Sequence, residues 1–207
     1  MDITALVVGR LQANCYIVGS ERTKKAVIID PGGDPEEIVN AVNEKGYDVE
    51  YILNTHGHMD HVAGNSYVKR KLGGKLAIHP DDEPMLNDST MSIFTQSEQE
   101  KPERVKPDLY LHNHDEVHCG DMTLKVIHTP GHTQGGVCFL IENHLFSGDT
   151  LFAGSVGRWD FPGGSHEDLV RSITEKLMVL DDSVIVYPGH GPTSSIGFEK
   201  QHNPFLS

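Results

Sequence analysis

Four potential metal ligands lie close together in the stretch THGHMDH, residues 55–61, and they are His56, His58, Asp60 and His61. The stretch follows the apolar run VEYIL, which is typical of a buried strand. Imidazole and carboxylate groups without a thiolate suit zinc, manganese or iron. The sequence therefore predicts a metal centre in the loop at the end of this strand.

The spacing of these four residues indicates more than one metal ion. Gly57 permits a tight backbone path, so His56 and His58 can turn toward one point. Asp60 and His61 are expected to begin the following helix, where adjacent side chains point about 100° apart. They cannot easily complete the site of His56 and His58, but they can supply a neighbouring one. This pattern predicts two metals in an open, catalytic centre.

Three further candidate ligands stand at other strand ends: His132 in TPGHTQGG, Asp149 in LFSGDTLF and His190 in YPGHGP. Each is flanked by glycine, which lets the backbone approach a crowded centre. With the first four they make five histidines and two aspartates. Two ions about 3.5 to 4 Å apart that share a carboxylate need about this number of protein ligands and still leave positions for water.

The elements that position these residues can be followed along the first half of the chain. The runs ALVV, CYIV and AVIID are expected strands. A helix follows in DPEEIVNAVNEKG, with Asp34 as N-cap, Pro35 in the first turn and Gly46 at its end. The run VEYIL, a second helix in HVAGNSYVKRKLGG and the strand KLAIH come next.

The second half is richer in strands. These are TLKVIH, GVCFLI, HLFSGD and SVIVY, and a helix begins at Ser165 with Asp168 three residues later. Strand-rich and helix-bearing stretches occur in both halves, a pattern that predicts an α/β fold of two packed sheets with helices outside.

The order THGHMDH, PGH, GDT and PGHG, with IIDPGG near the start and GRWDFPGG after Asp149, resembles the metallo-β-lactamase fold superfamily. Within it the chain is most similar to short glyoxalase II-like (hydroxyacylglutathione hydrolase-like) enzymes. This resemblance covers residues 1–207 and implies a single domain, a four-layered αββα sandwich with the metals at one edge of the sheets.

The resemblance also implies a role for each ligand. It assigns His56, His58 and His132 to the first metal and Asp60, His61 and His190 to the second, with Asp149 as the bridge. Asp60 and Asp149 are expected to take part in catalysis as well. Two zinc ions are the expected cofactors, with iron or manganese as alternatives at either site. Asp30 is either a partner of a ligand histidine or a turn-forming residue before Pro-Gly.

The chemistry expected of this centre is hydrolysis. Two cations lower the pKa of a bridging water toward ~7 and polarise an acyl oxygen. No G-x-S-x-G motif or convincing Cys/His pair supplies another nucleophile. We therefore predict attack of metal-bridging hydroxide on a thioester. By resemblance the substrate is S-lactoylglutathione or a related hydroxyacyl thioester, although the helical domain that binds glutathione in long glyoxalase II enzymes has no counterpart here.

Two other functions stay open. A mononuclear iron oxidoreductase similar to persulfide dioxygenases would use His56, His132 and Asp149. A nuclease or a non-catalytic metal-binding relative is the third. The formal net charge of −13 disfavours a nucleic-acid partner.

Composition bounds the remaining expectations. The N-terminus matches neither a signal peptide nor a membrane span, so we expect a cytoplasmic protein without membrane contact and with a small-molecule thioester as its partner. The oligomeric state is not indicated. Cys15, Cys119 and Cys138 are expected to be buried and inert, and the histidines of LHNHDEVH to be solvated. The polar segment 85–107, with Met91, Ile93 and Phe94, is either a surface loop or a substrate lid.

Overall fold

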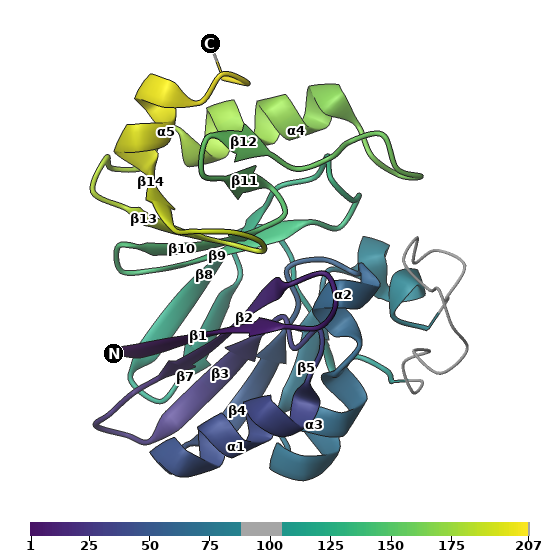
Figure 1. The fold of residues 1–207 in the computed structure, drawn as a ribbon, viewed down its shortest axis with the longest axis vertical. Coiled ribbons are helices and arrows are strands. Elements are labelled where there is room, and N and C mark those ends of the chain that lie inside the picture. Colours follow the sequence, from purple (N-terminus) through teal and green to yellow (C-terminus); the bar gives the residue numbers. More distant parts are fainter. Residues whose placement is uncertain (88–104, 207) are drawn as a thin grey trace.

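The computed structural model describes residues 1–87 and 105–206. Two six-stranded sheets form its centre, with helices on the outer face of each (Figure 1). This is the predicted four-layered α/β sandwich. Among the described residues no helix is long and apolar enough to cross a membrane.

The first sheet comes from the N-terminal half and has the strand order β1-β2-β3-β4-β5-β6. Its strands are Asp2–Val8, Ala13–Gly19, Lys25–Ile29, Asp48–Leu53, Lys75–Ile78 and Leu109–Tyr110. The first three pair antiparallel, whereas β3, β4, β5 and β6 pair parallel. Their carboxyl ends therefore meet at one edge.

The second sheet has the order β14-β13-β10-β9-β8-β7. Its strands are β7 Glu116–Cys119, β8 Met122–His128, β9 Val137–Ile141, β10 His144–Gly148, β13 Ile185–Pro188 and β14 Ser194–Ser195. A small hairpin of β11 (Leu151–Phe152) and β12 (Ser155–Val156) lies beside it. Because β10 is parallel to β13, and β9 is antiparallel to both β8 and β10, the strands β8, β10 and β13 end at the same edge.

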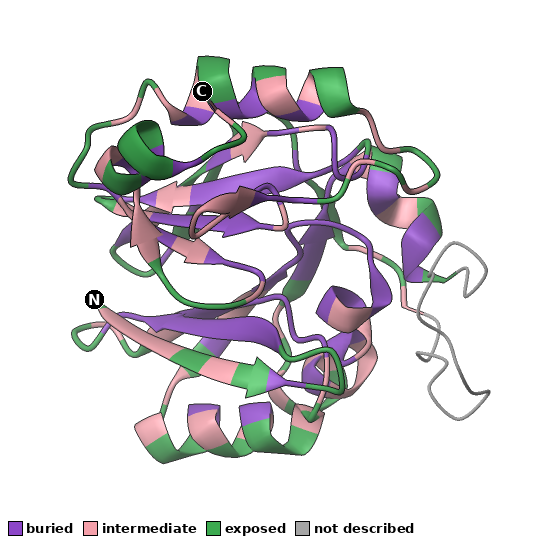
Figure 2. Ribbon diagram, turned by 45° about the horizontal axis from the view of Figure 1, so that its top comes forward, coloured by how far each residue is buried: buried purple, intermediate pink, exposed green. Residues whose placement is uncertain are grey.

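The helices cover the outer faces of both sheets. They are α1 Pro35–Lys45, α2 Met59–Val62, α3 Asn65–Leu72, α4 His166–Ser172 and α5 Ile196–His202, with the 3-10 helix η1 Pro80–Leu86 and the π-helical turn η3 Ile173–Leu177. Side chains of α1 and α3 pack on the first sheet, and those of α4, η3 and α5 pack on the second. Figure 2 shows the resulting buried interior and exposed outer helix faces.

The structure corrects two local expectations. Asp34 occupies the N-cap position of α1, but its side chain makes no capping bond; it accepts from the Gly9 N–H at 2.7 Å instead. The second predicted helix is two helices, α2 and α3, because the chain turns between them against the first sheet: the Gly64 N–H donates to the Pro31 carbonyl at 2.7 Å. Ser165 does cap α4, by accepting from the Asp168 N–H.

The predicted burial of the cysteines is confirmed, whereas the prediction for the polar segment 85–107 falls mostly on residues that the structure does not describe. All three cysteines are free and buried. Met91, Ile93 and Phe94 fall within residues 88–104, outside the described part of the chain, so the lid stays a prediction. Asn87 and Val105 are the described residues on either side of that segment. The Asn87 side-chain amide exchanges two hydrogen bonds of 2.9 Å with the Val105 backbone.

We expect the packing between the two sheets to contribute strongly to the stability of the fold. Phe139 is fully buried in the cluster that joins them, so Phe139→Ala should lower the free energy of unfolding by about 3–5 kcal/mol. Val179→Ala is the matched control, because Val179 is 71% exposed and its loss should change stability by less than about 0.5 kcal/mol. Urea denaturation measures both, and equal effects would contradict the assignment of Phe139 to the core.

Candidate metal centre

The strand ends bring all seven predicted ligands to one edge of the sandwich. His56 and His58 follow β4, and Asp60 and His61 lie in α2. His132, Asp149 and His190 follow β8, β10 and β13, respectively. The first four therefore come from one sheet and the other three from the second. Their role as metal ligands stays a prediction, and their geometry allows it to be assessed.

The first group consists of His56, His58 and His132, whose potential ligand atoms lie within 4.8 Å of one another. His58 Nδ1 is 2.8 Å from His132 Nε2. The His56 ring centroid lies 4.8 Å from each of the other two. All three side chains are buried, so they form a compact set of nitrogen atoms shielded from water.

Hydrogen bonds fix which nitrogens of this group carry protons. Thr55 Oγ1 donates to Asp30 at 2.6 Å, so its oxygen accepts from His56 Nδ1 at 3.0 Å. His132 Nδ1 donates to the Arg158 carbonyl at 2.7 Å. Since Nδ1 donates in both bonds, Nε2 is the nitrogen of His56 and of His132 that faces inward. His56 Nε2 is buried and has no hydrogen-bond partner among the described residues.

The second group consists of Asp60, His61 and His190. His190 Nε2 lies 3.2 Å from Asp60 Oδ2 and 3.4 Å from His61 Nε2. His61 Nδ1 donates to Asp30 Oδ2 at 3.0 Å, and His190 Nδ1 donates to the Gln12 carbonyl at 3.3 Å. Both Nε2 atoms face inward, as they do in His56 and His132. Of the two roles considered for Asp30, the structure shows the contact with a candidate ligand histidine.

Asp149 lies between the two groups. Its Oδ2 is 3.6 Å from His132 Nε2 and 3.7 Å from His190 Nε2, and its Oδ1 is 3.4 Å from His61 Nε2. Oδ1 is nevertheless buried, and no described residue forms a hydrogen bond with it. Gly189 makes this approach feasible, because a Cβ there would lie 2.2 Å from Asp149 Oδ1.

Charge is unevenly divided between the groups. Burial and the nearby histidines lower the pKa of His58 to about 3, and burial holds the pKa of His56 well below its usual range. Burial also disfavours protonated His61, but Asp149, Asp60 and Asp30 outweigh this and raise its pKa to about 10. Burial thus favours neutral His56 and His58 in the first group, whereas carboxylates dominate the second group and attract a cation.

These features fit bound divalent cations. Nitrogen and carboxylate oxygen atoms converge, and two of those buried atoms lack any hydrogen-bond partner in the described part of the chain. Buried polar groups are rarely left without one. The three carboxylates around His61 lie 3.0 to 3.7 Å from its nitrogens, an accumulation of negative charge that a metal would neutralise in place of a proton.

Sequence reasoning missed several residues that shape the centre. Thr55 and Asp82 bond to the loops that carry the ligands. The Phe161 ring lies 5.8 Å from the His58 ring and borders the first group, and the Arg158 guanidinium stacks 3.9 Å above it. Phe152 lies 6.3 Å from His190 on the other side. The contacts of Asp82 with Gly57, of Phe161 with His58 and of Phe152 with His190 join distant segments, so no local pattern in the sequence marks them.

A further histidine cluster does not form a comparable site. His79, Asp81 and His128 lie close together, but the two rings stack 4.2 Å apart at an interplanar angle of 9°. Lone pairs of parallel rings lie in separate planes, so they cannot converge on one ion. His112 and His118 have largely exposed side chains, in agreement with their expected solvation.

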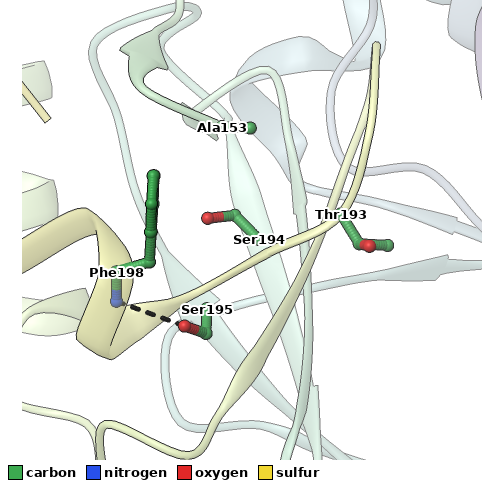
Figure 3. Close-up of a pocket in the computed structure, with 5 residues that line it drawn as sticks. All are labelled: Ala153, Thr193, Ser194, Ser195 and Phe198. Carbon is green, nitrogen blue, oxygen red and sulfur yellow. Dashed lines mark hydrogen bonds between the residues drawn. The ribbon is translucent and has the colours of Figure 1, made fainter. Parts of the chain in front are cut away.

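A shallow pocket of about 380 Å³ lies beside β14 and α5 (Figure 3). It is lined by Ala153, Thr193, Ser194, Ser195 and Phe198, and the Phe198 N–H donates to Ser195 Oγ across its wall. None of these residues is one of the seven candidate ligands. We therefore place the chemistry at the metal centre rather than in this pocket.

Comparison with known proteins agrees with this geometry. Residues 8–190 match the family model described as Metallo-beta-lactamase superfamily. The hydroxyacylglutathione hydrolase GloC of Haemophilus influenzae is 34% identical, over 100% of this chain and 99% of that protein. The BLEG-1 B3 metallo-beta-lactamase has a TM-score of 0.93 at 35% identity, with complete coverage of both chains.

A third similarity concerns metal content. TTHA1623, solved in a di-iron-bound form, has a TM-score of 0.85 and is 34% identical, covering 98% of this chain and 100% of that one. The family match, the full-length relatives and the observed sandwich lead to the same assignment: the chain belongs to the metallo-beta-lactamase superfamily.

Proposed function

We propose that the protein is a metal-dependent hydrolase that cleaves a hydroxyacyl thioester such as S-lactoylglutathione. One observation carries the two-metal part of this proposal: the Asp149 carboxylate faces both groups of inward-pointing nitrogens. The substrate class is supported by the full-length similarity to GloC, which is named as a hydroxyacylglutathione hydrolase.

The residues present would hold two ions. His56, His58 and His132 would bind one, Asp60, His61 and His190 the other, and Asp149 would contact both. Bound in this way, divalent cations make water acidic enough to supply a nucleophile at neutral pH and polarise an acyl oxygen. Zinc suits a set of imidazole and carboxylate donors, and iron or manganese would suit it as well.

The chain itself would orient the substrate and move protons. His56 and His61 are buried and form the floor of the centre, whereas His190 is partly exposed. A substrate would therefore approach from the side of Asp60 and His190, between the aromatic walls of Phe152 and Phe161. Asp60 Oδ2 faces this side and is placed to accept a proton from an attacking water.

Two other activities must be distinguished from thioester hydrolysis. An iron oxidoreductase acting on a persulfide needs only His56, His132 and Asp149, but would leave the two carboxylates of Asp30 and Asp60 beside His61 without a second metal. The second candidate is β-lactam hydrolysis, which the similarity to the BLEG-1 B3 metallo-beta-lactamase favours. Both reactions can be measured beside thioester cleavage on the same preparation.

A substrate panel tests the proposed activity. The zinc-loaded protein should release free thiol from S-lactoylglutathione, as followed with a thiol reagent. It should act more weakly on a β-lactam and take up no oxygen with glutathione persulfide. Oxygen uptake by an iron-loaded preparation that cleaves no thioester would overturn the proposal, and faster turnover of the β-lactam would reassign the substrate.

Replacing one candidate ligand tests the need for both ions. His190→Ala should release one metal per chain and lower thioesterase kcat. Loss of a residue that only bonds to a ligand already lowers metal affinity ~10- to 100-fold, and loss of the ligand itself should lower it more. The first group keeps its three histidines, so one ion should remain. His118→Ala is the control, since His118 lies exposed on β7.

Metal stoichiometry by elemental analysis decides the outcome. Loss of activity with two ions still bound would show that His190 is not a ligand. Full activity with one ion would show that hydrolysis needs only the first group.

Removal of metal should also destabilise the fold. A chelator should lower the thermal midpoint, and zinc at about 100 times its Kd should restore about 2.7 kcal/mol. His56→Ala should reduce this response, because its Nε2 is one of the atoms without a partner inside the protein. Differential scanning fluorimetry measures the shift. An unchanged response in His56→Ala would show that His56 does not bind the zinc that stabilises the fold.

A further inference from the structure

Asp82 is a buried carboxylate that belongs to neither group of candidate ligands. It lies in η1, and its relative exposure is 1%. Its Oδ2 accepts from the Gly57 N–H at 2.9 Å and from the Thr133 hydroxyl at 2.7 Å, and its Oδ1 accepts from the Gly135 N–H at 2.7 Å. All observed hydrogen bonds of this buried carboxylate therefore come from two loops, one that contains Gly57 and one that contains Thr133 and Gly135.

Those two loops carry the whole first group. Gly57 stands between His56 and His58, and Thr133 directly follows His132. The loops follow β4 and β8, strands of different sheets. Asp82 is thus a direct link between the two halves of the sandwich at the point where their ligands meet.

The backbone is shaped to allow this link. A Cβ on Gly57 would lie 2.9 Å from the Asp82 carbonyl oxygen and 2.6 Å from the Met85 Cβ. A Cβ on Gly135 would lie 2.7 Å from Asp82 Oδ1. Both contacts are closer than real Cβ atoms allow, so glycine at each position lets the loop close onto η1.

Only a carboxylate satisfies all three donors. Its two oxygens accept every bond, and hydrogen bonds to a charged acceptor are short and strong. An asparagine would offer one oxygen and one NH₂ group, so at least one of the three donors would face another donor. Leaving a buried donor without a partner costs about 1–3 kcal/mol.

We propose that Asp82 is a positioning residue for the first metal site. Its carboxylate holds the loop of His56 and His58 against the loop of His132, and so maintains the close approach of His58 Nδ1 and His132 Nε2. The histidines of the second group bond to Asp30 and to the Gln12 carbonyl instead. None of the observed Asp82 side-chain bonds goes to that group. This inference rests on the proposed metal-binding role of the first group.

The test compares Asp82→Asn with Asp81→Asn, a matched change at the adjacent, largely exposed carboxylate. Zinc affinity at each site is measured by competition with a chromophoric chelator. Asp82→Asn should weaken one site about 10- to 100-fold and leave the other unchanged, as for the loss of an outer contact. Asp81→Asn should bind zinc like the wild type. Unchanged affinity in Asp82→Asn, or an equal fall at both sites, would overturn the proposal.

Two additional measurements separate positioning from general stability. Thr133→Val removes one of the three bonds and should weaken the same site by a smaller factor; weakening of the other site would contradict the proposal. In the metal-free protein, Asp82→Asn should speed hydrogen exchange at the amides of Gly57 and Gly135 more than elsewhere. A uniform increase would reveal a merely structural role. None of these readouts depends on thioesterase activity, so a protein that binds zinc but cleaves no thioester would refute the proposed function alone.

Discussion

The clustering of three carboxylates around one buried imidazole is the constraint on which the rest of the structure depends. Asp30, Asp60 and Asp149 all lie within 4 Å of His61, which is fully buried. Charge removed from water must be compensated by partners of opposite charge or by hydrogen-bond donors. The fold brings such partners to the edge of the sheets from four separate strand ends. Packing between the sheets keeps those ends in register.

The two groups of ligands are built on the same principle but differ in setting. In each, two ring Nδ1 atoms donate to an oxygen outside the centre, so that Nε2 of His56, His132, His61 and His190 faces inward. The first group is made of buried histidines held between loops of both sheets. The second contains an aspartate and the partly exposed His190, so it is the more open side. One centre thus combines a rigid inner half with an outer half that a substrate can reach.

The sequence predicted the strand ends well, because apolar runs and flanking glycines are local signals. The candidate ligands in THGHMDH, and His132, Asp149 and His190, were predicted from the sequence, and the structure places all seven at one edge of the sheets. Contacts between distant segments could not be predicted in this way. The Asp34 side chain accepts a hydrogen bond from Gly9 instead of capping its own helix. The Gly64 N–H donates to Pro31, and this turn separates two helices that the apolar pattern predicted as one. Asp82 lies in the run HPDDEP, which indicates a turn and nothing of the loops that bond to it.

His190 is held where the N-terminal and C-terminal parts of the chain meet. It pairs with Ala13 in an isolated β-bridge, and the Asn14 N–H donates to the Gly189 carbonyl at 2.7 Å. Ribosomes synthesise proteins from the N-terminus, so β1 and β2 are exposed long before their partner at Gly189 exists. The second group therefore cannot assemble before His190 has been synthesised. If this group binds a metal, it can do so only after that point, a temporal order imposed by topology alone.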